Sequence, residues 1–567
     1  MILLDFANLT GEQNILLNQV AQDIRKPFND FISKLYEGRE NDIDWLLSSI
    51  ASRNIFSSPL FMNCCYLALV KRTIESEHLP DTIVVSSKSM KEVLDKYLFK
   101  AGYFINVEYS ASLAKMKAKA FPPFPWVRHC VYFLYQYLKL KNKGEKVNDS
   151  SKAITIIDTP ILSSSFKNGA YYDRYYPELL NFSDNTEKQL VYYCPTFFQV
   201  WNYDEVIGEI KKIQGQVLLK EDYLKFKDYL LALFHTRRIL RKNIDHCYFM
   251  DFEMTPILKE EIHRCSSNGS TIMGILNYMF AKRLKEQGIK VRLVINWFEN
   301  RTVDRGFNLG FRKYFPEAHV KGYYGGVCHE NYPHLVPSWN EASSRVIPQQ
   351  ITVMGKGMIE KSLEFCQDLD VIAAPAFRFQ HVWRERIHYP DPDKFTILVA
   401  LPIVLEDGNY ILKLLATTSD NKVLATCRFY IKPHPFNSLA RIYKYFGNSW
   451  PECFELISGD FSDWVEKSDL LISNASSTCL ETVAKGIPVI IIGNRLGLTQ
   501  NPIPQNIEDD IWTLCYTEEE LLQAVLFYMN RDEETIKRHE QTGRKIREMF
   551  FEPVTREGVR RFLNLED

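Results

Sequence analysis

The chain has 567 residues, of which 46% are hydrophobic and 25% are charged, and its formal net charge at pH 7 is -1. This length exceeds what one hydrophobic core normally serves, so we expect two or more domains, and the near-zero charge argues against a general nucleic-acid binder. The 12 cysteines are scattered without a C-x-x-C pair, which is typical of a protein from a reducing compartment.

The N-terminal sequence MILLDFANLTGEQN has no basic leader, so we do not expect a signal peptide. No apolar stretch approaches the roughly 20 residues that a membrane-spanning helix needs. We therefore expect a cytoplasmic protein. Loose attachment to the inner face of a membrane, through aromatic or basic patches, stays open.

Alternating strands and helices are predicted along the first two thirds of the chain. The series opens with a strand at 82–86, a helix at 88–99 and a strand at 104–109. Its later members are strands at 153–158, 189–194, 290–297, 320–324, 350–354 and 370–374, and a helix at 300–314. Helical stretches near 11–78 and 220–288 are predicted to be insertions in this plan.

A break is predicted at 388–394 (HYPDPDK), where prolines and aspartates form a short polar run. A second series of elements follows, at 396–401, 410–416, 427–431, 443–445, 470–473, 479–485 and 489–492, before a mostly helical segment at 518–567. The predicted domains are 1–390 and 391–545, with a C-terminal helix at 546–567 that packs back on the first domain. The predicted fold class is α/β, with two doubly wound Rossmann-like domains facing a central cleft.

Two polar motifs come directly after strands of the second series. Lys432-Pro433-His434-Pro435 follows the strand at 427–431, and Asn474-Ala475-Ser476-Ser477-Thr478 follows the strand at 470–473. Strand ends that carry a histidine and a serine pair beside the start of a helix can form a phosphate-binding wall. The sequence therefore predicts a site for a phosphate-bearing small molecule.

His434 lies between two prolines, which stiffen the loop and hold the imidazole in one direction. A phosphate nearby would raise the pKa of His434, which could then donate a charge-assisted hydrogen bond to a leaving phosphate. Lys432 is counted among the residues that bind the donor. The alternative is a turn histidine bonded to a backbone carbonyl, and the serine pair downstream favours the functional interpretation.

The hydroxyls of Ser476, Ser477 and Thr478, together with free backbone N–H groups of the following helix, can hold phosphate oxygens. Thr478 and Glu481 also match a capping box, which requires no ligand. Glu481 is therefore predicted to cap the helix, to bind ribose hydroxyls, or to do both.

The run from 396 to 493 resembles the C-terminal nucleotide-binding domain of GT-B glycosyltransferases that build bacterial surface polysaccharides. Its histidine–proline and serine/threonine motifs are similar to those of sialyl-, polysialyl- and Kdo-transferases, which use CMP-activated ulosonic acids. The resemblance covers about a hundred residues well and the rest only in plan. It implies that His434, Ser476 and Ser477 bind the CMP phosphate and that Glu481 lies near the ribose. Similar motifs in CDP-glycerol-type transferases leave the nucleotide open.

Two acidic residues are candidates for the general base. Glu299 follows the strand at 290–297, where Glu299-Asn300 and the later Gly322-Tyr323 resemble the acceptor side of surface-carbohydrate biosynthesis proteins. Glu406-Asp407-Gly408 matches an acidic-acidic-glycine motif of some sialyltransferases, which implies Glu406 as the base. The alternatives are a helix-cap region around Glu299, and a turn with a helix start around Glu406.

Three further patterns are compatible with either a functional or a structural role. Gly355 and Gly357 allow close approach of a ligand or form a tight turn. Residues 173–176 (DRYY) contact sugar or pack on the surface. A basic cluster is predicted either to attract an anionic glycan or lipid head group or to form a solvated helix face. The cluster comprises Arg237, Arg238, Arg241 and Lys242.

No metal and no cofactor are predicted. Aspartate pairs at 42/44, 368/370 and 391/393 lack the context of a metal-binding loop, and a histidine with a helix N-terminus can neutralise a nucleotide phosphate without a cation.

The predicted function is transfer of a sugar, with a CMP-activated ulosonic acid such as sialic acid or Kdo as the first choice of donor. The predicted partners are this nucleotide-sugar donor and a glycan or glycolipid acceptor. A CDP-polyol phosphotransferase, a UDP-sugar 2-epimerase and a non-catalytic scaffold of polysaccharide assembly are the alternatives.

Overall fold

The computed structural model describes residues 3–76, 79–110, 125–147, 152–162, 165–167, 170–198, 200, 202–214, 216–384, 394–418, 422, 424–434, 437, 439–446, 450–494, 497–504, 506–507 and 509–565. The predicted break at 388–394 lies outside these residues except for Lys394, as do Asp391, Asp393 and Pro435.

The first part of the chain builds a small parallel sheet of its own. Strands β1 (Leu3–Asp5), β2 (Thr82–Val85) and β3 (Asn106–Tyr109) are paired in the order β1-β2-β3. The helices of this part are α1 (Gly11–Asp23), α2 (Arg25–Tyr36), α3 (Ile43–Leu46), α4 (Leu60–Glu75), α5 (Lys88–Ala101) and, from later in the chain, α13 (Thr255–Ser266). The strands predicted at 82–86 and 104–109 therefore exist, but they do not join the large sheet of the first domain.

The large sheet of the first domain has six parallel strands in the order β13-β12-β11-β10-β4-β7. They are β4 (Ile154–Ile161), β7 (Val191–Phe197), β10 (Val291–Trp297), β11 (His319–Tyr324), β12 (Gln350–Val353) and β13 (Asp370–Ala373), close to their predicted positions. In chain order this sheet reads 6-5-4-3-1-2, so the strand order reverses between β4 and β10. Ligands of doubly wound sheets bind at such a switch point, outside the carboxyl ends of the strands.

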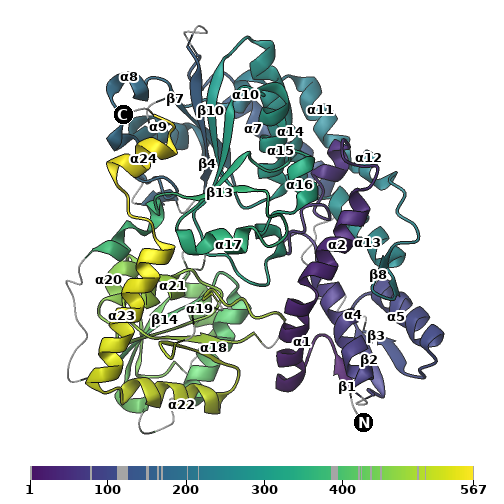
Figure 1. Cartoon of the computed structure of the whole chain (residues 1–567), viewed down its shortest axis with the longest axis vertical. Helices are drawn as coiled ribbons and strands as arrows, with labels where there is room; N and C mark the ends of the chain where they lie inside the picture. The colour runs from purple at the N-terminus through teal and green to yellow at the C-terminus, as the bar shows by residue number, and fades with distance from the viewer. Residues whose placement is uncertain are drawn as a thin grey trace.

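Helices pack on this sheet in the upper half of Figure 1. The close approach of α14 to α15 requires glycine, because a Cβ at Gly306 would lie 1.9 Å from the carbonyl oxygen of Gly274. The longer helices here are α7 (Pro125–Leu140), α9 (Tyr203–Gln214), α11 (Phe226–Leu233), α14 (Gly269–Glu286) and α15 (Thr302–Tyr314). The short helix α12 (His235–Leu240) follows α11 and contacts α13 and α3.

The second domain, drawn in green and yellow in Figure 1, contains another six-stranded parallel sheet, in the order β16-β15-β14-β17-β18-β19. Its strands are β14 (Thr396–Ala400), β15 (Arg428–Lys432), β16 (Phe454–Leu456), β17 (Leu470–Ser473), β18 (Val489–Ile492) and β19 (Trp512–Cys515). Its helices include α18 (Leu405–Thr418), α19 (Leu439–Phe446), α20 (Phe461–Val465), α21 (Thr478–Val483) and α22 (Glu518–Met529). The order 3-2-1-4-5-6 is that of the Rossmann fold, with its switch point between β14 and β17.

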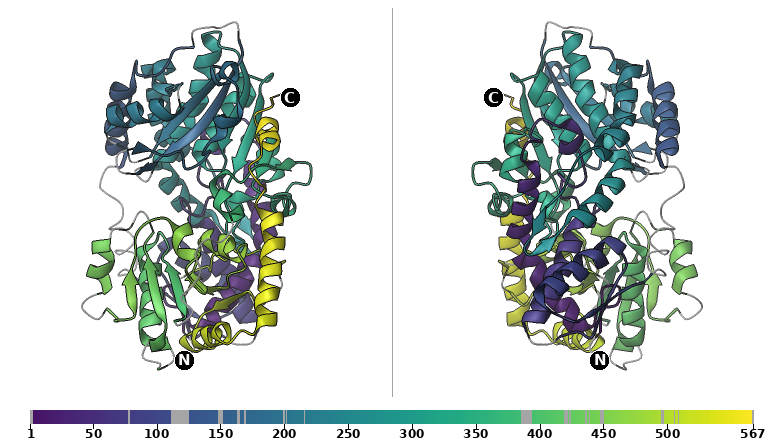
Figure 2. Two further views of the ribbon diagram at one scale, coloured as in Figure 1. Left: turned by 90° about the vertical axis from the view of Figure 1, so that its left-hand side faces the viewer. Right: turned by 90° about the vertical axis from the view of Figure 1, so that its right-hand side faces the viewer.

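The C-terminal helices connect the two domains. Helix α23 (Glu533–Phe550) lies along the second domain, and α24 (Arg556–Phe562) ends on the first domain (Figures 1 and 2). Val559 and Phe562 of α24 are buried against Trp297 and Tyr323 of the large sheet. Gly355 makes room for this crossing, because a Cβ there would lie 2.3 Å from the carbonyl carbon of Phe550. The group that approaches Gly355 closely is therefore the backbone of Phe550 in the same chain.

The predicted fold class is confirmed. Two doubly wound α/β domains of Rossmann type face a cleft that residues of both domains line, which is the GT-B arrangement. Within the described residues, no helix combines the length and the apolar character that crossing a membrane requires.

Candidate functional site

A cleft of about 580 Å³ lies between the two domains, at the switch points of both sheets. The first domain contributes Glu299, which follows β10, and the second contributes His434 after β15 and Ser476 and Ser477 after β17. Carboxyl ends of parallel strands meet at one edge of a sheet, which explains why motifs 40 residues apart in sequence share this cleft. Four of the predicted site residues are thus brought together.

The second domain is held against the first part of the chain beside this cleft. The side chain of Asn14 in α1 donates a hydrogen bond to the Gly497 carbonyl at 3.1 Å, and Thr499 N donates to Asn18 Oδ1 at 2.7 Å. Asn331 of the first domain donates to the Thr499 carbonyl at 2.7 Å. These bonds fix the loop that carries the cleft-lining residues Gly497 and Leu498.

The imidazole of His434 is neutral at pH 7 in this structure. Burial, together with the positive charge of Arg174, lowers the pKa of His434 to about 4. The rise in the pKa of His434 predicted near a phosphate applies to the bound state; without an anion, burial first and the charge of Arg174 second both favour the neutral imidazole. An anion bound in the cleft would reverse the effect, so that protonation of His434 is coupled to anion binding.

Ser476 and Thr478 are hydrogen bonded to each other, with the Thr478 hydroxyl donating to Ser476 Oγ at 2.7 Å. Thr478 begins α21 and is not among the residues that line the cleft. Lys432 also lies outside that lining, and its ammonium group donates to the carbonyl of Gly459 at 2.6 Å. Of the residues of the two motifs predicted to bind the donor, His434, Ser476 and Ser477 present polar groups to the cleft.

The predicted capping box at the start of α21 is wrong. Ser477 is the residue before the helix and makes no side-chain cap bond. The carboxylate of Glu481 instead lies 2.8 Å from Nε2 of His381, in the segment Phe377–Trp383 of the first domain. Glu481 is buried and does not line the cleft, and in this structure its carboxylate is hydrogen bonded to the first domain.

Glu299 is held by two neighbours at the carboxyl end of β10. The indole Nε1 of Trp297 donates to Glu299 Oε1 at 2.6 Å, and Arg301 Nε lies 3.3 Å from Oε2. The backbone N–H groups of Glu299 and Arg301 both donate to Asp304, at 2.9 and 3.1 Å. Burial raises the pKa of Asp304 to about 7, although the charge of Arg301 opposes the rise. Asp304 is therefore buried in the cap of α15, while Arg305 pairs with Glu341 at 2.6 Å.

The acidic-acidic-glycine motif places its second carboxylate at the cleft. Glu406 is exposed in the first turn of α18 and is not part of the cleft lining, whereas Asp407 is. Burial raises the pKa of Asp407, with a smaller contribution from the negative charge of Glu406. The carboxylate of this motif that faces the cleft is thus one residue later than predicted.

The DRYY segment at 173–176 packs largely into the core, with Arg174 near residues of the cleft. Tyr175 packs against the ring of Trp297 with 4.6 Å between centroids, and Tyr176 is buried. Arg174 is near enough to influence the pKa of His434, and burial and the positive charge of Arg378 lower its own pKa. Arg378 lines the cleft. Two arginines from the first domain therefore add positive charge near Glu299 and His434.

Several cleft residues are not signalled by any sequence motif. Among the described residues, Nδ1 of His329, Nδ1 of His334 and Oε1 of Gln500 are buried and have no hydrogen-bond partner. All three side chains line the cleft. Burial lowers the pKa of His329 to about 4 and that of His334 to about 3. Unpaired buried polar atoms are costly, so they indicate a place where a ligand or water supplies the partners.

A second, larger cavity of about 980 Å³ adjoins the cleft, and we call it the polar groove. Ile55, Phe56, Ser58 and Pro59 line both cavities. The rest of the groove is rich in hydroxyl, amide and charged groups: Ser57, Asn63, Ser86, Ser87, Lys88, Tyr109, Glu260, Arg264, Ser267, Asn268, Gly269 and Ser270. Phe56, 71% exposed, stands at the junction and meets the ring of Tyr332 at 5.0 Å.

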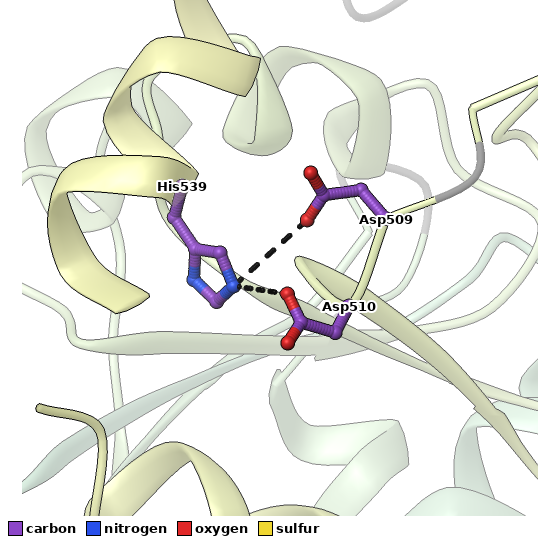
Figure 3. Close-up of side chains that lie close together, drawn as sticks. All are labelled: Asp509, Asp510 and His539. Carbon is purple, nitrogen blue, oxygen red and sulfur yellow. Dashed lines mark hydrogen bonds and ion pairs between the residues drawn. The ribbon is translucent and has the colours of Figure 1, made fainter. Parts of the chain in front are cut away.

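One cluster in the described residues has the composition of a metal site, and it lies in the second domain away from the cleft lining. Asp509, Asp510 and His539 converge there (Figure 3). His539 Nε2 lies 2.8 Å from Asp510 Oδ1, and the Thr542 hydroxyl donates to Asp509 at 2.6 Å. Partial burial opposes ionisation of Asp510, but bonds from Arg538 and His539 lower its pKa to about 2. These partners account for the cluster as an ion-pair network that ties α23 to the segment before β19.

Comparison with known proteins yields structural likenesses only. No protein-family model matches the chain, and no curated protein matches it in sequence. A Staphylococcus aureus structure described as MnaA with UDP is 11% identical, with a TM-score of 0.42 over 73% of this chain and 98% of that one. A putative UDP-N-acetylglucosamine 2-epimerase from Listeria monocytogenes is 13% identical, with a TM-score of 0.40 over 73% and 95%. Acinetobacter baumannii MurG is 10% identical, with a TM-score of 0.38 over 73% and 99%. The similarity is low in each case, and the fold assignment rests on the two strand orders.

Proposed function

We propose that the chain is a glycosyltransferase that binds a nucleotide-sugar donor in the cleft. The observation that carries the proposal is the convergence of His434, Ser476 and Ser477 from one domain with Glu299 from the other around a single cavity. A neutral imidazole and two hydroxyls suit a phosphate, and a carboxylate opposite them suits an acceptor hydroxyl.

In the proposed reaction, Glu299 removes the proton of the acceptor hydroxyl, and the hydroxyl oxygen attacks the anomeric carbon of the donor. The bond between that carbon and the phosphate oxygen breaks, and its electron pair leaves with the nucleotide. His434, protonated once the phosphate is bound, stabilises this charge together with the Ser476 and Ser477 hydroxyls. Trp297 and Arg301 hold the Glu299 carboxylate in place.

The proposed donor is a CMP-activated ulosonic acid. Such a sugar carries a carboxylate next to its anomeric carbon, and Arg174 and Arg378 provide positive charge beside the cleft. Arginine is well suited to binding carboxylates.

The polar groove is the proposed path of a glycan acceptor. It opens into the cleft beside Phe56, and its many hydroxyl and amide groups can exchange hydrogen bonds with sugar hydroxyls. An exposed aromatic ring at the junction offers an apolar surface to the face of a sugar ring.

The test is a screen of activated donors with mass-spectrometric detection of the released nucleotide. We expect the wild-type protein to release CMP from CMP-linked ulosonic acids. The His434→Ala variant should lose this activity. Turnover of CDP-glycerol would instead identify a CDP-polyol phosphotransferase. Epimerisation of UDP-N-acetylglucosamine would identify a UDP-sugar 2-epimerase. Unchanged polymer production by cells that carry His434→Ala would contradict catalysis and favour a scaffold.

A further inference from the structure

Helix α7 presents an apolar stripe to solvent. Val127, Val131, Leu134 and Leu138 recur at helical spacing and are between 47% and 67% exposed. The opposite side of the helix packs into the domain, where Phe133, Gln136 and Leu140 are buried. The exposed stripe is therefore not the side on which α7 packs.

Helix α11 lies beside α7, and α12 follows α11 along the chain (Figure 1). The indole of Trp126 in α7 donates to the Leu233 carbonyl at 3.2 Å, and the rings of Tyr137 and Tyr229 meet at 5.1 Å, so α7 and α11 lie side by side. The exposed apolar residues of α11, the residue after it and α12 are Phe226, Leu230, Leu231, Phe234 and Leu240. We call the exposed side of α7, α11 and α12 the α7–α12 face.

The charge on this face has one sign. Its exposed cations are Arg128, Lys139, Lys227, Arg237 and Arg241. Lys225, exposed directly before α11, pairs with Glu286 at 3.2 Å. Helix α7 contains no acidic residue, and the one acid in the sequence from 225 to 242 is Asp228, which is buried. Asp228 accepts a hydrogen bond from Arg283 Nε at 2.8 Å. In a chain with a net charge of -1, five exposed cations among exposed apolar side chains are a local concentration of positive charge.

We propose that the α7–α12 face docks on an anionic lipid bilayer. Large exposed apolar patches mark interaction sites, and apolar side chains flanked by arginine and lysine fit the boundary between lipid head groups and acyl chains. Arginines beside the patch pair with lipid phosphates, and each basic residue near an anionic surface contributes about 1 kcal/mol. Charge complementarity favours an anionic membrane over a second copy of the chain, which would bring like charges together.

Helix α7 borders the polar groove through the side opposite its exposed stripe, where His129 recurs at helical spacing with Phe133, Gln136 and Leu140. Nε2 of His129 lies 3.0 Å from the carbonyl oxygen of Ser267, and the imidazole ring occupies the space that a Cβ at Gly269 would take. Ser267 and Gly269 both line the groove. The docking itself does not depend on the transfer reaction.

Vesicle co-sedimentation tests the proposal with phosphatidylcholine vesicles, with and without phosphatidylglycerol. The wild-type protein should bind vesicles that contain phosphatidylglycerol, and high salt should release it. The Arg237→Gln/Arg241→Gln variant should partition about 25-fold less, at about fivefold per arginine. The Val131→Ser/Leu134→Ser/Leu138→Ser variant should partition at least roughly tenfold less, because it loses inserted apolar groups.

The matched control is Phe527→Ser, a residue of α22 in the second domain that is 46% exposed, and it should bind as the wild type does. All three variants change exposed side chains, so their unfolding midpoints should match the wild type, which separates lost docking from lost folding. Equal binding to vesicles with and without phosphatidylglycerol, or full binding by the triple variant, would overturn the proposal. A wild-type protein that binds no vesicles and sediments as a dimer in analytical ultracentrifugation, while the triple variant sediments as a monomer, would also overturn the proposal.

Discussion

His381 and Glu481 are hydrogen bonded across the two domains, with 2.8 Å between Nε2 and Oε2. His381 belongs to the segment Phe377–Trp383 near the end of the first domain, and Glu481 lies in α21, directly after the serines of the cleft. Glu481 is buried, so this pair fixes the position of α21 relative to the first domain.

Removal of the Glu481 carboxylate should therefore affect stability more than nucleotide affinity. Glu481→Ala leaves His381 without its partner, and we expect the free energy of unfolding to fall by about 2 kcal/mol. Glu481→Gln keeps a hydrogen-bond acceptor and should lose less. Urea unfolding and nucleotide titration of both variants check this. A Glu481→Gln protein that is fully stable but has lost nucleotide affinity would instead support contact with the ribose.

Nucleotide binding should take up a proton at His434. The pKa of His434 is about 4 without ligand, and a bound phosphate raises it, so affinity should increase as the pH falls from 8 toward 6. The limiting slope for one proton is about tenfold in affinity per pH unit. Calorimetric titration in buffers of different ionisation enthalpy measures the uptake. The His434→Gln variant should keep only the pH dependence that comes from the nucleotide's own phosphate. Equal proton uptake by the wild type and His434→Gln would contradict the role of His434.

Glu299→Gln should lower kcat by about 10²- to 10⁴-fold, because the amide no longer accepts the acceptor proton. Donor binding should be little changed, since Glu299 belongs to the opposite wall. The control is Glu406→Gln, whose side chain is exposed and outside the cleft lining, and its kcat should equal that of the wild type. Loss of activity in Glu406→Gln with full activity in Glu299→Gln would reverse the assignment.

Chelation of divalent cations should leave the rate of donor turnover unchanged. Arg378 in the cleft, Arg174 beside it and a protonated His434 supply positive charge near the bound phosphate. Turnover measured with EDTA, and again after addition of Mg²⁺ or Mn²⁺, checks this expectation. A loss of turnover in EDTA that either ion restores would show that the enzyme uses a cation.

The sequence was sufficient for the parts of the site that depend on strand ends. His434 and Ser476 share a cleft because the strands before them are parallel members of one sheet, and parallel order follows from alternating strands and helices. Glu299 reaches the same cleft for the same reason in the first domain. Such reasoning requires only that each strand be recognised.

Other parts depend on contacts that a local pattern does not encode. The four-residue strands β2 and β3 look like members of any parallel sheet, and only tertiary packing separates them from the large one. The choice between Glu406 and Asp407 depends on a rotation of one residue at the start of α18. The partner of Glu481 lies 100 residues away in sequence, whereas the local pattern predicted a helix cap, a ribose contact or both.

Calorimetric titration of CMP, CDP, UDP and GDP into the wild type, His434→Ala and Lys432→Ala tests the central claim most directly. Lys432 lies outside the cleft lining and is the matched control. We predict that CMP binds with the highest affinity, that His434→Ala weakens this binding at least about tenfold through loss of a charge-assisted hydrogen bond, and that Lys432→Ala leaves it unchanged. Absence of binding by all four nucleotides, or equal affinities in the wild type and His434→Ala, would contradict the account.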